Sequence, residues 1–262
     1  MSGYKEVFKR IEIKYLLNEE QLSGLMPYLE TMAKVDRYGL SRINNIYFDT
    51  PDYRLVKTSM EKPIYKEKLR LRTYGKTDDD TNSFIEIKKK YDGVVYKRRI
   101  SGRYLDTYSY LISRNSAKDS FDHSQISKEI REFLKLYGDL RPAMCICYDR
   151  IAMIGTEDAE FRVTFDRNIT WNDKCTDLRK AGEGRKLLKD GQCLMEIKVS
   201  NSMPMGLARK LSELKIFPVS FSKYGSGYAD MINTVTYKKT ERTADLSPVK
   251  EGGVMKGVAA YV

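Results

Sequence analysis

The sequence predicts an α+β protein built on an antiparallel β-sheet with helices packed outside it. Two observations predict this class: apolar and polar residues alternate with a period of two along most of the chain, and a few capped helical segments interrupt the alternation. A third observation is that basic residues recur at the same parity in most of these strands. A sheet closed into a barrel around them would form a lumen that binds anions and holds a metal.

The predicted strands share this alternation and cover residues 8–17, 45–50, 65–75, 84–90, 94–100, 144–154, 161–169 and 193–200. The clearest basic row is Lys66, Lys68, Arg70 and Arg72, which alternates with partly apolar neighbours. Like charges in a row repel one another unless water or a bound anion lies beside them. A solvated outer face explains any one such strand, whereas matching parity across several strands favours an enclosed basic surface.

The predicted helices cover residues 18–33, 124–138, 204–215 and 225–235. The first has a capping-box pattern in Asn18 and Gln21, and Pro27 would bend or break it. Ser124 is a typical N-cap for the second, and Gly138 a typical end. No linker or repeat interrupts the pattern, so we expect one domain over residues 1–238, followed by a tail of loop or disorder over 239–262.

Composition limits the class of partner. The 262 residues carry a net charge of +11, which favours polyanions such as nucleic acid, an anionic membrane surface or phosphorylated small molecules. No apolar run approaches the roughly 18 residues of a membrane span, and the first residues do not resemble a signal peptide. We therefore expect a cytoplasmic protein that does not insert into a membrane itself.

Cysteine and histidine usage argues against two kinds of site. The cysteines Cys145, Cys147, Cys175 and Cys193 form no CxxC pair and have no nearby histidine, which predicts reduced thiols rather than structural zinc. The single histidine, His123, lies in a polar stretch where a surface or cap role is expected. A catalytic triad or a histidine general base is therefore not expected.

Eight segments in order carry a resemblance to a known family: RIEIKYLL, NIYFDTPDY, EKLRLRTYG, FIEIKKKYDGVVYKRR, RPAMCICYDR, FRVTFD, LMEIKVS and FSKYGSGY. Over residues 8–230 the chain resembles the VTC domain, the polyphosphate polymerase branch of the CYTH-like triphosphate tunnel metalloenzymes. The resemblance implies a closed antiparallel β-barrel, or tunnel, of about eight strands with helices outside. It also implies that the tunnel binds a triphosphate through basic side chains and a divalent metal, Mn²⁺ or Mg²⁺.

The resemblance also implies roles for individual residues. The basic residues assigned to the reaction, by their match or by their shared parity, are Lys14, Arg70, Arg72, Lys88, Lys97, Arg150, Arg162, Lys198 and Lys223. Those expected to hold the triphosphate directly are Arg70, Arg72, Lys88, Arg150 and Arg162. Glu196 matches the principal metal ligand, and Glu12 and Glu86 are further metal or lysine partners. The superfamily pattern E-x-E-x-K begins here with Arg10, which points away from its adenylate cyclase and thiamine triphosphatase branch.

The implied reaction is metal-dependent transfer of a phosphoryl group from ATP to a growing polyphosphate chain. Such transfer needs positioning and charge neutralisation rather than a protein nucleophile. With water as the acceptor the same site is a triphosphatase, and without catalysis it is a polyphosphate sensor or scaffold that works through a membrane-protein partner. A nucleic-acid partner is not expected: stacking would require exposed aromatic residues among the charges, and the 19 tyrosines permit this without indicating it. We expect a monomer that binds ATP or another triphosphate and polyphosphate; the sequence leaves the acceptor open.

Overall fold

The computed structural model describes residues 11–92, 94–113, 124–200 and 202–245, and the chain forms two units, residues 1–228 and 229–262. In the first unit the strands are β1 (Ile11–Leu17), β2 (Ala33–Asp49), β3 (Tyr65–Tyr74), β4 (Asn82–Tyr91), β5 (Val94–Arg103), β6 (Arg141–Gly155), β7 (Arg162–Asn172), β8 (Arg185–Lys186) and β9 (Cys193–Val199). The helices of the described chain are α1 (Glu19–Glu30), α2 (Arg54–Met60), α3 (Tyr104–Ile112), α4 (Gln125–Tyr137), α5 (Met205–Glu213) and α6 (Lys223–Asp245), with a 3₁₀ turn η1 (Leu178–Lys180).

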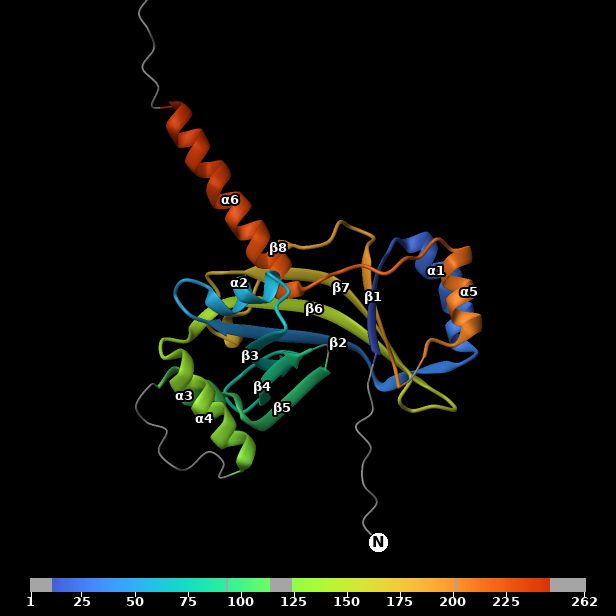
Figure 1. Ribbon diagram of the computed structural model, residues 1–262, viewed down its shortest axis with the longest axis horizontal. Helices are drawn as coiled ribbons and strands as arrows, with labels where there is room; N and C mark the ends of the chain where they lie inside the picture. The colour runs from blue at the N-terminus through green and yellow to red at the C-terminus, as the bar shows by residue number, and fades with distance from the viewer. Residues whose placement is uncertain (1–10, 93, 114–123, 201, 246–262) are drawn as a thin grey trace, which may run out of the picture. The chain divides into compact units, whose positions relative to one another are not determined.

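All the strands belong to one antiparallel sheet (Figure 1). Its order is β1-β9-β7-β6-β2-β3-β4-β5, and β8 pairs with β7 outside this path. The prediction of an antiparallel sheet accompanied by helices is therefore confirmed. The predicted hairpin of β4 and β5 is present as well, with Lys88 opposite Lys97.

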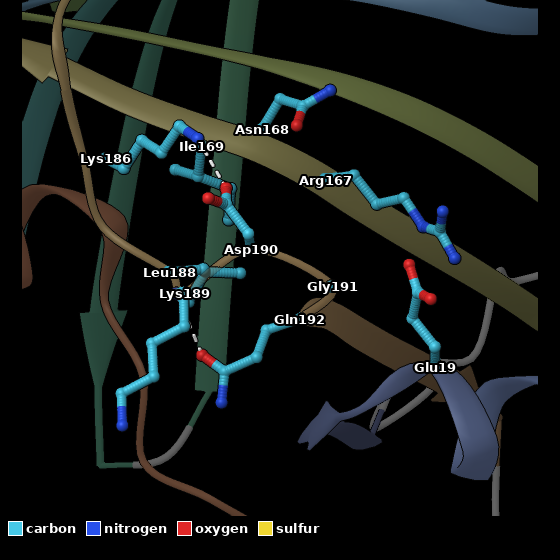
Figure 2. A pocket seen from close by; sticks show the side chains of 10 residues that line it. All are labelled: Glu19, Arg167, Asn168, Ile169, Lys186, Leu188, Lys189, Asp190, Gly191 and Gln192. Carbon is cyan, nitrogen blue, oxygen red and sulfur yellow. Dashed lines mark hydrogen bonds and ion pairs between the residues drawn. The ribbon is translucent and has the colours of Figure 1, made fainter.

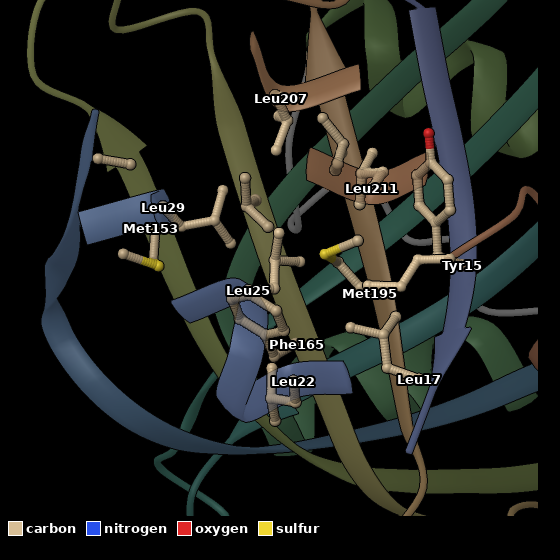
Figure 3. Close-up of a cluster of buried hydrophobic side chains, with 14 of the residues drawn as sticks. Tyr15, Leu17, Leu22, Leu25, Leu29, Met153, Phe165, Met195, Leu207 and Leu211 are labelled. Atoms are coloured by element: carbon tan, nitrogen blue, oxygen red, sulfur yellow. The ribbon is translucent and has the colours of Figure 1, made fainter. Parts of the chain in front are cut away.

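Helices cover the apolar side of each half of the sheet. Tyr15, Phe165 and Met195, from β1, β7 and β9, pack with leucines of α1 and α5 such as Leu25 and Leu211 (Figure 3). Apolar residues of β2 to β4 pack in a second cluster with α3 and α4. Because strand side chains alternate between faces, this packing directs the residues of opposite parity to the other side, which we call the inner face.

The sheet path ends at β1 and β5. No ladder joins these two strands within the described ranges, so the hydrogen-bonded path is open where a closed barrel was predicted. The sheet nevertheless curls until Glu12 Oε2 on β1 lies 3.6 Å from Lys88 Nζ on β4. Two strands whose side chains meet end to end lie farther apart than the roughly 4.8 Å between hydrogen-bonded strands. The ion pair of Glu12 and Lys88 therefore spans a gap that backbone hydrogen bonds would have to bridge in a closed barrel.

Several elements differ from the prediction. β2 begins at Ala33 rather than at residue 45, because its polar first half pairs with the end of β6. α2 was not predicted, since its cap is remote: Asp49 accepts from the backbone N–H groups of Leu55 and Val56. β8 and α3 were also missed; α3 has no side-chain cap. α1 continues through Pro27 to Glu30, and its predicted capping box is present.

The last helix is longer than predicted. α6 runs to Asp245, so residues 239–245 are helical although a tail of loop or disorder was predicted from residue 239. Residues 246–262 lie outside the described ranges, as do Arg10 and His123. No helix among the described residues has both the length and the apolar character required to cross a membrane.

Candidate functional site

A buried carboxylate organises the basic row of β3. Glu86 is 1% exposed, and its Oε2 lies 2.6 Å from Arg70 Nε and 3.8 Å from Arg72 Nε. Its other oxygen lies 2.5 Å from Lys97 Nζ on β5. Burial alone would raise the pKa of Glu86, but the three cations outweigh it and hold that pKa well below its usual range. Glu86 therefore stays ionised and fixes the positions of cations from two strands.

A second buried carboxylate, Asp166, fixes the positions of cations from β6 and α6. Asp166 on β7, also 1% exposed, accepts from Arg150 through both oxygens, at 2.6 and 2.8 Å. Lys223, the first residue of α6, lies 2.5 Å from Asp166 Oδ2. Burial would raise the pKa of Asp166, but Lys223 and Arg150 lower it. This bidentate pair gives the guanidinium a defined orientation.

The end strand β1 and its neighbour β9 contribute a mixed cluster. Glu196 lies 2.7 Å from Lys198 Nζ and 4.0 Å from Lys14 Nζ. Glu12 lies 3.6 Å from both Lys14 and Lys88 and 4.0 Å from Lys198. The two carboxylates thus share lysines across paired strands. Burial would raise the pKa of Glu196, yet Lys198 and Lys14 hold it well below its usual range.

Polar and aromatic side chains of β2 and β6 form hydrogen bonds with the arginines of β3. Arg72 Nε donates to Asn45 Oδ1 at 2.9 Å, and its NH2 donates to the Tyr148 hydroxyl at 3.1 Å. Arg70 NH1 donates to the Tyr47 hydroxyl at 3.4 Å. Because these partners accept without adding a full negative charge, the guanidinium groups keep their capacity to attract an anion.

Crowding of cations is visible in the lysines of the inner face. The pKa of Lys68 is lowered well below its usual range by burial and by the nearby charges of Lys88 and Arg70. Burial likewise lowers the pKa of Lys88 and of Lys97, even though each faces a carboxylate. A bound polyanion would relieve this repulsion, so the surface fits a phosphate chain electrostatically.

The donors suit a divalent metal only in part. Among the described residues no group of three or more His, Cys, Asp or Glu side chains could hold a metal ion. Glu12 and Glu196 both pair with Lys14 and Lys198, and opposite Glu196 on β7 the buried Thr164 Oγ1 has no hydrogen-bond partner. Mg²⁺ and Mn²⁺ accept a few carboxylates together with water and phosphate oxygens, so these residues fit such an ion. Glu86 fits a counter-ion role better, because three cations already surround it.

The structure brings together most of the residues predicted from the sequence. Lys14, Lys88, Lys97, Lys198 and Lys223 join the arginines in the contacts given above. Arg162 has inner-face parity but is exposed at the start of β7, where its Nε donates to Ala159 O at 3.4 Å. It makes no ion pair with the other predicted residues among the described contacts.

Sequence reasoning missed three residues of this face, Asp166, Tyr47 and Tyr148, and it placed Lys68 in the basic row without assigning it to the site. Lys68 shares its parity with Arg70, so the alternation could have identified it. Asp166 has the parity of Arg162 on its strand, but only the pairing of β6 with β7 places it opposite Arg150. The two tyrosines carry no chemical signal in the sequence that separates them from core aromatics.

The hollow drawn in Figure 2 is separate from this face. It has a volume of about 140 Å³ and lies beside β7, β8 and the start of α1. Arg167, whose side chain faces Glu19 across the hollow, alternates with Asp166 and so belongs to the outer face of β7 (Figure 2). The basic side chains that line the hollow are mixed with acidic ones, as in the pair of Lys186 and Asp190. It has no excess of cations comparable to that of the inner face.

The chain is similar in sequence to known proteins. The sequence profile of the VTC domain matches residues 9–232. Over 194 residues, 64% of this chain, the sequence is 23% identical to vacuolar transporter chaperone complex subunit 4 of Schizosaccharomyces pombe, and it spans only 27% of that protein. A solved structure titled as a putative adenylate cyclase from Vibrio parahaemolyticus aligns with 83% of this chain and 96% of its own, with 11% identity and a TM-score of 0.43.

The profile match extends from the residues just before β1 into α6, and it includes each of the three carboxylate-centred clusters. The chain therefore belongs to the VTC domain family.

Proposed function

We propose that this chain transfers phosphoryl groups from ATP to a growing polyphosphate chain, with Mn²⁺ or Mg²⁺. One observation carries the proposal: in the described clusters of the inner face, nine basic side chains accompany four acidic ones. The basic set is Lys14, Lys68, Arg70, Arg72, Lys88, Lys97, Arg150, Lys198 and Lys223, and the acidic set is Glu12, Glu86, Asp166 and Glu196. The unbalanced positive charge suits a substrate with several adjacent phosphates.

The proposed role of the arginines is to bind and orient the phosphates of the substrate. Arg70 and Arg72 on one part of the face, and Arg150 on the other, are each held by a buried carboxylate. Preorganised guanidinium groups bind phosphate oxygens without a further cost of orientation and spread the charge that develops during transfer. A linear triphosphate held at two such points is aligned along the face, which is the geometry that in-line transfer requires.

The lysines and carboxylates of β1 and β9 would hold the metal end of the substrate. Glu12 and Glu196 are the residues that would bind the ion, together with phosphate oxygens. When bound, such an ion neutralises charge on the phosphates and polarises the bond that breaks. Lys14 and Lys198, which contact these carboxylates, would in turn contact the phosphates.

The proposed acceptor is the end of a phosphate chain, which needs no general base because it is already ionised at neutral pH. The space inside the curled sheet would act as the tunnel once a phosphate chain occupies it. The bound chain would then limit the access of water to the transferred group. The name of the fission yeast relative describes a subunit of a vacuolar transporter chaperone complex, which supports the proposal that this chain works with a membrane-protein partner.

The deciding experiment incubates the purified protein with ATP and Mn²⁺ and separates the products. We expect ADP and an acid-labile phosphate polymer whose length grows with time. If free phosphate is released without polymer, the protein is a triphosphatase. If no triphosphate is consumed but polyphosphate binds, the sensor or scaffold function replaces catalysis.

A further inference from the structure

A pair of thiols lies on the outer face of the sheet, away from the proposed phosphate site. Cys145 is buried on β6, and Cys175 is half-buried in the segment that follows β7. Although the two residues are 30 positions apart, their Sγ atoms are 2.7 Å from each other. This separation is shorter than ordinary contact between two sulfur atoms, so no other side chain lies between them.

The segment that carries Cys175 is anchored on both sides of the pair. Cys175 N donates to Asn172 Oδ1 at 3.2 Å, where β7 ends. Beyond the cysteine, Asp177 accepts from the Tyr104 hydroxyl at 2.8 Å and pairs with Arg179. Because these contacts fix the backbone around Cys175, the two thiols stay together and are not brought together by chance motion of a free loop.

We propose that Cys145 and Cys175 form a reversible disulfide by exchange with a low-molecular-weight disulfide such as oxidised glutathione. The bond would fasten the segment after β7 to strand β6. This proposal does not depend on the phosphoryl transfer proposed above, because neither sulfur faces the inner surface.

The two cysteines have different roles in the exchange. Cys145 donates its thiol hydrogen to Cys175, and this contact lowers the pKa of Cys175 to about 7. Half-exposed and substantially ionised at neutral pH, Cys175 is the attacking thiolate. Cys145 remains protonated, since its thiol donates this hydrogen bond and burial raises its pKa further.

The chemistry balances in two displacements. The Cys175 thiolate attacks one sulfur of the oxidised glutathione, a mixed disulfide forms, and one glutathione thiolate leaves. Cys145 then loses its proton and attacks Cys175 Sγ, so the protein disulfide forms and the second glutathione leaves. The two protein thiols are oxidised, one glutathione disulfide is reduced to two thiols, and the two protons released by the cysteines are taken up by the glutathione thiolates.

A metal site is the other chemistry that neighbouring thiols support, and the structure argues against it. Cys147 lines the same small hollow as the pair. Within the described part of the chain, however, these thiols do not form a group of three that could hold a metal ion. The hollow, about 10 Å³ in volume, has little room for a larger ligand.

The test treats the 262-residue chain with oxidised glutathione at neutral pH and identifies the products by mass spectrometry without reduction. We expect the loss of two hydrogen masses, a peptide that links Cys145 to Cys175, and its disappearance on addition of reduced glutathione. Cys193→Ser, which removes a buried cysteine of β9, should still form the link, whereas Cys175→Ser should not. Amide hydrogen exchange should slow in residues 172–181 after oxidation.

Three results would overturn the proposal. The first is a stable glutathione adduct on Cys175 that does not close onto Cys145. The second is a disulfide that joins another pair of cysteines, and the third is oxidation that occurs only after the protein is unfolded. Zinc titration supplies a separate check, because binding that requires Cys145, Cys147 and Cys175 together would assign the thiols to a metal.

Discussion

Lys223 Nζ lies 2.5 Å from Asp166 Oδ2, so the first residue of α6 and a residue of β7 share an ion pair at the inner face. Arg150 holds the same carboxylate through two hydrogen bonds. The charge of Asp166 thus compensates two partly buried cations that approach it from different elements. In the absence of substrate, the integrity of this part of the site depends on one carboxylate.

We predict that Asp166→Asn destabilises the ligand-free protein by up to about 3–5 kcal/mol, since it leaves two partly buried cations without their buried counter-ion. Chemical denaturation with and without inorganic triphosphate measures the effect, and triphosphate should restore much of the loss. Asp149→Asn is the matched control. Asp149 forms its pair with Arg42 at a more exposed position, so its removal should cost about 0–1 kcal/mol. Equal losses in the two variants would contradict the assigned role of Asp166.

Replacement of Lys68 by methionine should change stability and binding in opposite directions. The charged form of Lys68 is disfavoured by burial and by Lys88 and Arg70, so Lys68→Met should raise the melting temperature of the ligand-free protein. The same change should weaken the binding of triphosphate, because one inner-face cation is lost. Calorimetry and thermal denaturation measure both effects, with Lys57→Met at an exposed position of α2 as a control that alters neither. A variant that binds triphosphate as well as wild type would remove Lys68 from the site.

Binding of inorganic triphosphate should be accompanied by uptake of protons at alkaline pH. The free protein holds the pKa values of Lys68, Lys88 and Lys97 below the usual 10.5, and a bound polyanion raises them again. A site whose pKa rises on binding takes up a proton, so affinity should fall as the pH rises through the pKa values of the free protein. Titration calorimetry in two buffers with different ionisation enthalpies, without metal, measures this uptake. Identical heats in both buffers would rule it out.

Glu196 and Glu86 should differ in their relation to the metal. Glu196→Gln is expected to abolish turnover with ATP and Mn²⁺ while triphosphate binding is largely retained, because a proposed metal ligand is lost and the cations remain. Glu86→Gln should lower stability, since Arg70, Arg72 and Lys97 lose their shared counter-ion. The turnover that remains in the Glu86→Gln variant should depend on Mn²⁺ concentration as wild-type turnover does. Turnover measured across a range of Mn²⁺ concentrations separates the two, and wild-type activity of Glu196→Gln would refute the metal assignment.

Much of the inner face could be predicted from local sequence. In β3 and β4 the period of two places Arg70, Arg72 and Lys88 opposite an apolar set that includes Leu69 and Ile87, and burial of that set directs the charges inward. The caps of α1 and α4 are equally local, because side chain and backbone partners lie three residues apart. Such features need no knowledge of the rest of the chain.

Contacts between residues on different strands could not be predicted from local sequence. Nothing near Asp166 in the sequence indicates that it meets Arg150, and nothing near Cys145 indicates Cys175. The polar first half of β2 was missed for a related reason, since its pairing with the end of β6 rather than its own pattern makes it a strand. These contacts depend on which strands become neighbours.

The sequence by itself determined which side chains share a face, because alternation along a strand is a local property of the backbone. Only the tertiary structure decided which carboxylate serves which cation, and how far the sheet curls between Glu12 and Lys88. The physical reason is that strand order and curl are set by burial of the outer apolar residues under α1, α5, α3 and α4. That burial is a cooperative property of residues far apart in the chain, and it also decided that the end strands meet through an ion pair rather than a ladder.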